Sequence, residues 1–380
     1  MQQELRIVAY YPSWSARGAT PYQVTDIPAE RITHINYAFA NISAETGQIM
    51  LGNPQADTDL VYAGDNHEPR ALHGHFNQLV LLKEKYPHLK TLISVGGWTW
   101  SGHFSDAAAS EEARRRFARS CAAFAARYDF DGVDIDWEYP ASKGMQEGRP
   151  EDTVNFTLLL AELRRQLDGQ SQLDGREYLL TIATPAGPTR VALIEVDRIH
   201  PYLDWINVMA YDFAGPGSPL TSFNAPLCAL SQSKDDDLPR VHTHAAIQAH
   251  LDGGAPPDKV VLGVPFYGKA WKGVLDKNNG LYQPHEGGAE LRTGYRDLVA
   301  NELYGMRRFW HQGAQVPWLY DAEKGIVISY DDPESMRLKG EYARAQGLGG
   351  LMFWQVTSDD GEHSLLKALT EGYVSKGLIE

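Results

Sequence analysis

The sequence has few cysteines and a shortage of positive charge, and each shortage excludes a class of protein. Only two of its 380 residues are cysteines, Cys121 and Cys228, so it resembles neither a disulfide scaffold nor a cysteine-ligated zinc protein. Cys121 lies in the apolar helical stretch "RRRFARSCAAFAARY" and is expected to be a buried free thiol. Lysine and arginine total 35 against 49 acidic residues, a net charge of -14. Nucleic acid and anionic membrane surfaces need basic patches, so the charge argues against both as partners, whereas it does not exclude a neutral polymer or a small molecule.

The chain also lacks a long apolar run and a recognisable leader. We therefore expect no transmembrane helix. The first residues, "MQQELRIVAYYPSW", show no basic segment followed by an apolar one, and a strand-like segment begins almost at once. Either the protein is intracellular, or a signal peptide was removed and a Met added for expression. Of the two, we expect an extracellular protein.

Short apolar runs alternate along the chain with longer amphipathic ones. The strand candidates are 6–11, 34–40, 91–97, 132–138, 178–184, 205–212, 260–266 and 350–354, and helical patterns cover 74–86, 111–128, 152–167, 242–251, 333–346 and 362–370. Strands that alternate with helices indicate a parallel sheet, and eight of them predict an α/β fold of the (β/α)8 TIM-barrel type. An open doubly wound sheet is the competitor. Its first strand usually ends in a Gly-rich turn, whereas this one ends in "YYPSW".

One interval is too long for a simple crossover between a strand and its helix. More than sixty residues separate the strand candidate 260–266 from the helix near 333, and turn residues alternate there with strand-like pieces. A structureless loop of that length is improbable. We therefore predict a small α+β insertion at 268–326 that forms a cleft wall between strand 7 and helix 7. The barrel would comprise 1–267 and 327–380, and we expect the protein to be a monomer.

The stretch "DFDGVDIDWEYP", residues 129–140, places carboxylates at alternate positions of an apolar strand. Residues i, i+2 and i+4 of a strand share one face, so Asp134, Asp136 and Glu138 point together. The alternating apolar residues suit the helix side, which leaves the three acids inside the barrel. They rise towards the carboxyl end of the strand, where barrel active sites lie. Asp131 is out of phase with them and is expected to anchor the turn that enters the strand.

Three carboxylates so close together cannot all stay charged cheaply, so we expect at least one shared proton. Glu138, the outermost, is the natural general acid. Asp136 lies one pleat below it, about 6.6 Å along the strand, and Asp134 supports Asp136 from below. Two alternatives remain open: structural acids held by salt bridges, and a divalent metal site that recruits Asp212 from another strand end.

Four motifs in strand order resemble glycoside hydrolase family 18, the chitinase family. They are "DGVDIDWE" at 131–138, "SVGG" at 94–97 followed by Trp98, "MAYD" at 209–212, and Trp354 in "GLMFWQ". The predicted insertion corresponds to the family's α+β insertion domain. The resemblance covers essentially the whole chain and implies a retaining mechanism in which the substrate's own 2-acetamido oxygen attacks the anomeric carbon.

The resemblance also assigns roles to individual residues. Glu138 becomes the acid and later the base, Asp136 holds the acetamido N–H, and Asp134 exchanges a proton with Asp136. Tyr211 binds the acetamido carbonyl. The further expected contacts and supports are Tyr10, Ser94, Gly97, Trp98, Met209, Asp212, Tyr267 and Trp354. No metal or cofactor is implied, and the expected partner is chitin or chitooligosaccharide.

The same resemblance leaves other functions open. A non-catalytic chitin-binding lectin typically lacks the acid, whereas Glu138 is present here. An endo-β-N-acetylglucosaminidase acting on N-glycans shares the three-acid pattern but usually lacks the insertion. A hydrolase of peptidoglycan shares the chemistry as well. Two departures from the family pattern concern binding: Lys269 stands where Arg is frequent, and a Trp common near Gly217 is absent.

Overall fold

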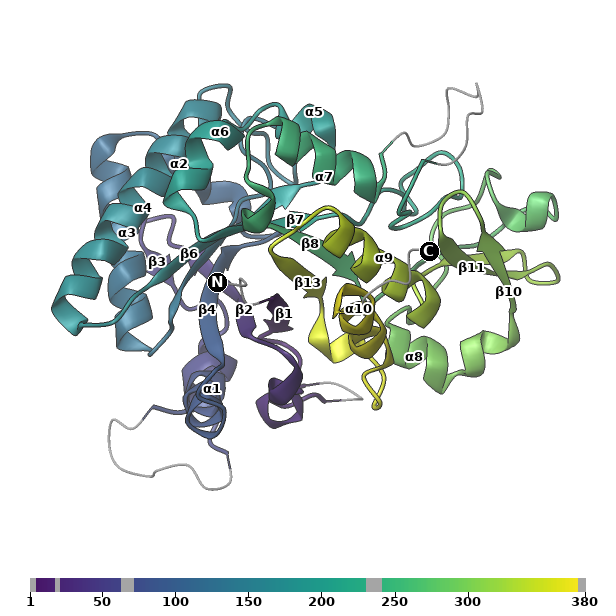
Figure 1. Ribbon diagram of the computed structural model, residues 1–380, viewed down its shortest axis with the longest axis horizontal. Helices are drawn as coiled ribbons and strands as arrows, with labels where there is room; N and C mark the ends of the chain where they lie inside the picture. Colours follow the sequence, from purple (N-terminus) through teal and green to yellow (C-terminus); the bar gives the residue numbers. More distant parts are fainter. Residues whose placement is uncertain (1–4, 18–20, 63–71, 230–240, 375–380) are drawn as a thin grey trace. The chain divides into compact units, whose positions relative to one another are not determined.

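The computed structural model describes residues 5–17, 21–62, 72–229 and 241–374 (Figure 1). A nine-stranded sheet contains the short strand β3 (Ile49–Met50) and eight barrel strands, namely β1 (Arg6–Pro12), β2 (His34–Ile42), β4 (Lys90–Gly96), β5 (Gly132–Asp136), β6 (Leu179–Pro185), β7 (Trp205–Met209), β8 (Val260–Pro265) and β13 (Gly350–Trp354). Their order is β1-β13-β8-β7-β6-β5-β4-β2, and β1 also pairs in parallel with β2. The sheet is therefore closed, and the predicted (β/α)8 barrel is confirmed.

The helices follow the strands as the periodicity indicates. They are α1 (Gly74–Lys85), α2 (Phe104–Ala108), α3 (Glu111–Arg127), α4 (Asp152–Asp174), α5 (Pro188–Val191), α6 (Val196–Ile199), α7 (Thr243–Asp252), α8 (Tyr295–Ala300), α9 (Pro333–Ala345) and α10 (Ser364–Val374). Every helix predicted from the sequence is found. The helix predicted at 152–167 is longer than expected, since α4 ends only at Asp174, before Gly175 with φ +68°.

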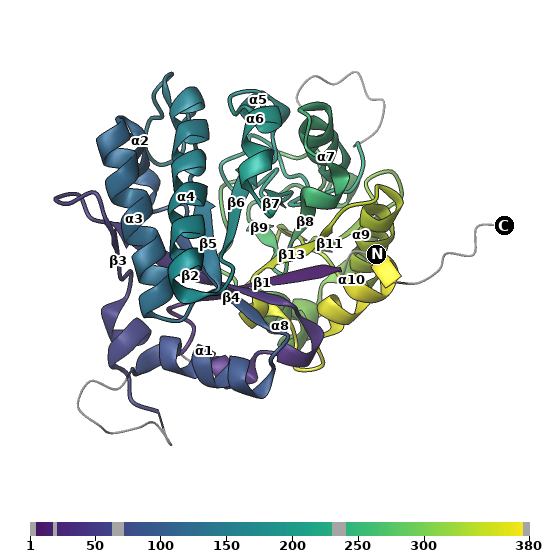
Figure 2. The same ribbon diagram turned by 60° about the vertical axis from the view of Figure 1, so that its left-hand side comes forward.

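Helix α3 shows how local chemistry sets these boundaries. The Ser110 side chain caps the helix by accepting a hydrogen bond from the Ala113 backbone N–H. Glutamates occupy the first turn and Arg127 the last, which complements the helix dipole. One face buries Phe117, Cys121 and Phe124, and Cys121 is a buried free thiol, as predicted. Figure 2 shows α3 and α4 side by side on the flank of the sheet that contains β5 and β6.

The chain divides into two compact units. The first comprises 1–185, 189–207 and 250–261, and the second comprises 186–188, 208–249 and 262–380. The first unit holds β1 to β6, including the short strand β3 (Ile49–Met50), which pairs antiparallel to β2. The second unit holds β13 and a separate antiparallel sheet.

That separate sheet overlaps the predicted insertion at 268–326, although its last strand continues to Ser329. It has four strands in the order β10-β11-β12-β9, with β9 (Lys269–Trp271), β10 (Arg307–His311), β11 (Val316–Asp321) and β12 (Ile326–Ser329). Strands β10 and β11 are drawn in green in Figure 1. Trp271 and Trp318 are buried in the hydrophobic cluster of this sheet. They therefore pack the insertion.

Candidate active site

Asp134 is fully buried in β5 and accepts hydrogen bonds from four neighbouring side chains. Its Oδ2 accepts from Tyr10 Oη at 2.8 Å and from Ser94 Oγ at 2.7 Å. Its Oδ1 accepts from Thr181 Oγ1 at 2.6 Å and from Asn207 Nδ2 at 3.3 Å. The donors come from β1, β4, β6 and β7, so the closed sheet itself surrounds this carboxylate with donors. Sequence reasoning named Tyr10 and Ser94 but missed Thr181 and Asn207.

Burial has the largest effect on the pKa values of Asp134 and Asp136. It raises the pKa of Asp134, although the four hydrogen bonds act in the opposite direction. The pKa of Asp136 lies well above its usual value, first because of burial and then because of the charges of Glu138 and Asp134. A raised pKa means that the acid keeps its proton to higher pH. Burial and the neighbouring negative charges therefore both favour the protonated form of Asp136.

Asp136 also carries a polar atom that no described residue satisfies. The side chain is 4% exposed, and its Oδ1 has no hydrogen-bond partner within the described parts of the chain. A buried acceptor without a donor is costly unless a ligand supplies one. The structure thus presents an acceptor for a ligand at the carboxylate that ends β5.

Glu138 lies two residues beyond the end of β5, although the sequence predicted a strand over 132–138. The ladder with β4 ends at the Gly96–Asp136 pair. Beyond it the Glu138 backbone N–H donates to Ser101 Oγ at 2.8 Å instead of to a strand. Ser101 is 5% exposed and contacts the Asp136 carbonyl as well, at 3.1 Å. It was missed by sequence reasoning because nothing in "WTWSGHF" distinguishes it.

Tyr139 contacts the general-acid candidate Glu138, and Trp98 lies next to Tyr139. Tyr139 is hydrogen-bonded to Glu138 through its side chain, and burial followed by the Glu138 charge raises the pKa of Tyr139. Trp98 is 49% exposed, and its ring centre lies 6.5 Å from that of Tyr139. An exposed Trp at the end of β4 suits stacking against a ligand.

Gly97 precedes Trp98 and has a specific conformational reason to be glycine. Its φ is +76°, and a Cβ there would lie 2.7 Å from the Phe39 ring. Its backbone N–H donates to the Asp136 carbonyl at 2.8 Å. Glycine at position 97 therefore lets the backbone after β4 pass close to the Phe39 ring and bond to the end of β5.

The second unit holds the other predicted contacts. Met209 ends β7, and Tyr211 and Asp212 follow it rather than lying within the strand as predicted. Asp212 Oδ1 accepts from Tyr267 Oη at 2.6 Å and pairs with Lys269 Nζ at 2.8 Å. The rings of Tyr211 and Tyr267 lie 6.2 Å apart. Lys269 therefore makes a single contact to the carboxylate in place of the fork that Arg offers.

Trp354, the last residue of β13, belongs to the same unit. Its carbonyl accepts from the Phe266 backbone N–H at 2.8 Å, which joins it to the residue that follows β8. The Trp354 side chain is partly exposed. Its position at a strand end suits contact with a ligand.

Asp131 has different surroundings from the three in-phase acids. Its Oδ2 accepts from the Thr91 backbone N–H at 2.9 Å and from Lys83 Nζ at 3.1 Å. These contacts tie the start of β5 to β4 and α1, as an anchoring residue would. Over the described ranges, no group of three or more His, Cys, Asp or Glu side chains is placed to hold a metal ion.

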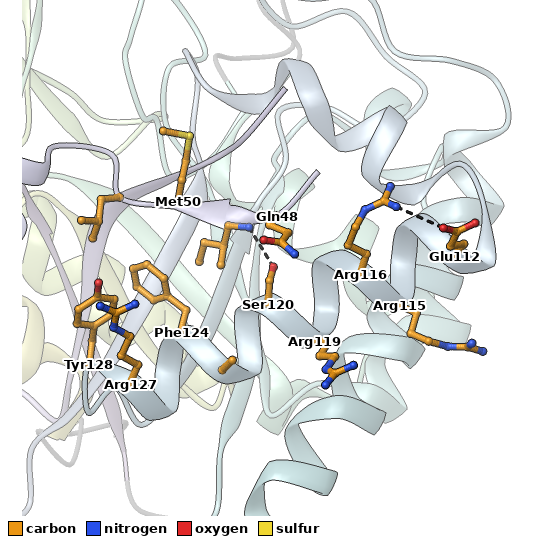
Figure 3. Close-up of a pocket in the computed structure, with 13 residues that line it drawn as sticks. Gln48, Met50, Glu112, Arg115, Arg116, Arg119, Ser120, Phe124, Arg127 and Tyr128 are labelled. Carbon is orange, nitrogen blue, oxygen red and sulfur yellow. Dashed lines mark hydrogen bonds and ion pairs between the residues drawn. The ribbon is translucent and has the colours of Figure 1, made fainter. Parts of the chain in front are cut away.

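A groove of about 650 Å3 lies elsewhere on the first unit (Figure 3). The segment Gln48–Leu51 and one face of α3 line it, including Arg115, Arg119 and Arg127. None of the predicted site residues takes part in it. Separately, none of the helices among the described residues is long and apolar enough to cross a membrane.

Comparison with known proteins finds relatives that are similar to nearly the whole chain. Chitinase A1 of Niallia circulans is 43% identical to this chain, over 93% of this chain and 56% of the relative. This chain thus spans little more than half the length of that relative. Chitinase 1 of Aphanocladium album is 35% identical over 97% of this chain and 85% of its own.

Solved structures agree with these relatives. Chitinase ChiA74 from Bacillus thuringiensis superimposes with a TM-score of 0.90 at 38% identity, over 99% of this chain and 71% of that one. An N-acetylglucosaminidase of glycoside hydrolase family 18 from Paenibacillus barengoltzii gives a TM-score of 0.82 at 33% identity, over 97% of this chain and 100% of that one. The family profile described as "Glycosyl hydrolases family 18" matches residues 6–359. The chain therefore belongs to glycosyl hydrolases family 18.

Proposed function

We propose that this chain is a chitinase that hydrolyses β-1,4 bonds between N-acetylglucosamine units with retention of anomeric configuration. The observation that carries the proposal is the buried Asp136, whose Oδ1 has no donor among the described residues. A 2-acetamido N–H supplies the missing donor. The named chitinases to which this chain is similar support the substrate.

In this mechanism the substrate provides the nucleophile. Glu138 donates its proton to the leaving glycosidic oxygen while the acetamido oxygen attacks the anomeric carbon, which forms an oxazolinium ion. Asp136 accepts from the acetamido N–H, and its negative charge stabilises the positive ring. Glu138, now a carboxylate, takes a proton from water, and this water opens the ring to the retained product.

The hydrogen bonds around Asp134 support the change of charge on Asp136. When Asp136 takes up negative charge in the reaction, Asp134 holds the shared proton. The hydrogen bonds from Tyr10 and Ser94 keep Asp134 in place during this exchange. Because both inner acids are buried, the proton moves between fixed groups and little solvent reorganisation is needed.

The remaining predicted residues are assigned to binding. Tyr211 hydrogen-bonds the acetamido carbonyl, and Trp354 forms the floor beneath the reacting sugar. Trp98 stacks on the leaving side, and Asp212 and Tyr267 add polar contacts to the substrate. Met209 and Gly97 shape the strand ends. Residues 268–326 form one wall of the cleft, and the barrel comprises 1–267 and 327–380.

The protein is further proposed to act as an extracellular monomer without metal or cofactor. Its substrate is an uncharged polymer, so binding needs no basic patch and is compatible with the net charge of -14. A second candidate is an N-acetylglucosaminidase, favoured by the similarity to the Paenibacillus protein of that name. An enzyme of that kind would release single sugars, whereas a chitinase of chain-binding type releases longer products.

Cleavage of the chitin hexamer should depend on the acetyl groups. The wild-type enzyme is incubated with the hexamer, with its fully deacetylated counterpart and with cellohexaose. Since only the acetylated chain carries the internal nucleophile, we expect its hydrolysis to be at least about 10³-fold faster. Product chromatography measures all three rates. Comparable cleavage of cellohexaose would contradict the mechanism, and release of monomers alone would favour the N-acetylglucosaminidase.

A further inference from the structure

Asn224 lies in the irregular stretch 210–229, which follows β7. Its side chain is fully buried, and its backbone and side-chain polar groups are all engaged. The side-chain Oδ1 accepts from the Asp212 backbone N–H at 3.1 Å, and Nδ2 donates to the Tyr267 carbonyl at 3.0 Å. The backbone N–H donates to Ser329 Oγ at 2.8 Å, and the carbonyl accepts from the Phe213 N–H at 3.0 Å.

The two side-chain hydrogen bonds of Asn224 hold the backbones of Asp212 and Tyr267, whose side chains are bonded to each other. Asp212 and Tyr267 are joined to each other through Tyr267 Oη and Asp212 Oδ1, 2.6 Å apart. Asn224 holds the backbone of each partner, with one bond to Asp212 and one to Tyr267. A single amide therefore sets the separation of the two backbones whose side chains meet.

Asp212 needs such support because of its own conformation. Its φ is +59°, in the left-handed region that residues other than glycine seldom adopt. Its side chain is 53% exposed, so packing contributes little to holding it. The hydrogen bond from its backbone N–H to Asn224 Oδ1 is a fixed contact that favours this conformation.

We propose that Asn224 is a positioning residue, which fixes the Asp212–Tyr267 pair so that both side chains are ready to bind the substrate. The proposal rests on the function proposed above, because that function makes the pair a substrate contact. The role requires one donor and one acceptor in fixed geometry, which asparagine supplies and an ionised aspartate does not. The bond to Ser329 joins the same residue to the end of β12.

The test compares Asn224→Asp with Ser329→Ala. Aspartate keeps the shape and the acceptor for Asp212, but above its pKa it places a second acceptor against the Tyr267 carbonyl. Ser329→Ala removes only the bond to the Asn224 backbone. We expect N224D to lower kcat/KM for the chitin hexamer by roughly 10- to 100-fold, mainly through KM. S329A should stay within about 3-fold of wild type.

The pH profile provides a readout that a general loss of stability would not give. A protonated carboxyl at position 224 donates again, so the KM of N224D should recover as the pH is lowered, whereas that of S329A should not. In Tyr267→Phe protein, where the pair is already broken, N224D should add less than about 3-fold. Equal losses in N224D and S329A, or full additivity with Y267F, would overturn the proposal and leave Asn224 as an anchor of the insertion alone.

A crystal structure of N224D separates failure of this inference from failure of the proposed function. We expect the Tyr267 Oη to Asp212 Oδ1 distance to lengthen beyond hydrogen-bond range at neutral pH. That result holds even if the wild type does not cleave chitin. An unchanged distance would overturn the positioning role. Should N224D not fold, Asn224→Ser, which keeps a smaller hydroxyl donor and acceptor, is crystallised with the same expected lengthening and the same overturning result.

Discussion

Replacing Glu138 with glutamine is expected to lower kcat for the chitin hexamer by about 10³-fold and to leave binding of the hexamer nearly intact. Glutamine has the shape of the glutamic acid but no proton to transfer to the leaving oxygen. Its backbone keeps the bond to Ser101 Oγ, so the position of the side chain is preserved. Turnover is followed by product chromatography, and binding by calorimetry under conditions in which cleavage is negligible.

The matched control for this variant is Glu147→Gln. Glu147 is exposed in the loop that follows Glu138, and the substitution removes the same single charge. It should keep near wild-type kcat. If E138Q also kept near wild-type kcat, Glu138 would not be the acid. If E138Q lost binding together with turnover, its role would be to hold substrate rather than to transfer a proton.

Replacing Asp136 with asparagine is the second change with a large expected effect. In the proposed mechanism the Asp136 charge stabilises the oxazolinium ion. The substitution removes this charge, and we expect kcat to fall by roughly 10² to 10³-fold. The amide of the D136N variant still offers an oxygen to the acetamido N–H, so KM should change far less than kcat. Steady-state kinetics with the hexamer give the two values separately.

Asp131→Asn, at the residue that immediately precedes β5, is the control. Asp131 holds Lys83 and the Thr91 backbone N–H, so its loss should lower the melting temperature with little change in kcat. The two variants thus separate stability from catalysis. A kcat for D136N within about 3-fold of wild type would contradict the assignment of Asp136, because the charge would then contribute little to the transition state.

The alternation of "VDIDWE" was enough to predict that Asp134 and Asp136 lie on one strand with a single residue between them. It did not predict where the strand ends, because the side chain of Ser101, which comes from another loop, receives the Glu138 N–H. Periodicity in the sequence reflects which side chains are buried. It carries no information on a hydrogen bond between two residues 37 positions apart in the chain. The predicted strand was therefore too long at its functional end.

Two of the polar residues around Asp134 could have been predicted from the sequence. Thr181 and Asn207 each stand inside apolar strand sequences, "YLLTIAT" and "WINVM". A polar side chain in a strand buried on both faces needs a partner, and an inward-facing acid is one. Asn224 offered no such signal, because its segment "SPLTSFNAPL" has neither strand nor helix periodicity. Its partners emerge only from the fold.

The substrate-assisted mechanism is tested most directly by the anomeric form of the first products. Chitin hexamer is hydrolysed by wild-type enzyme, and the new reducing ends are observed by NMR before mutarotation proceeds. Attack by the acetamido oxygen followed by water inverts the anomeric centre twice, so the β-anomer should predominate at early times. Early predominance of the α-anomer would show a single inversion by water and would contradict the mechanism proposed for Glu138 and Asp136.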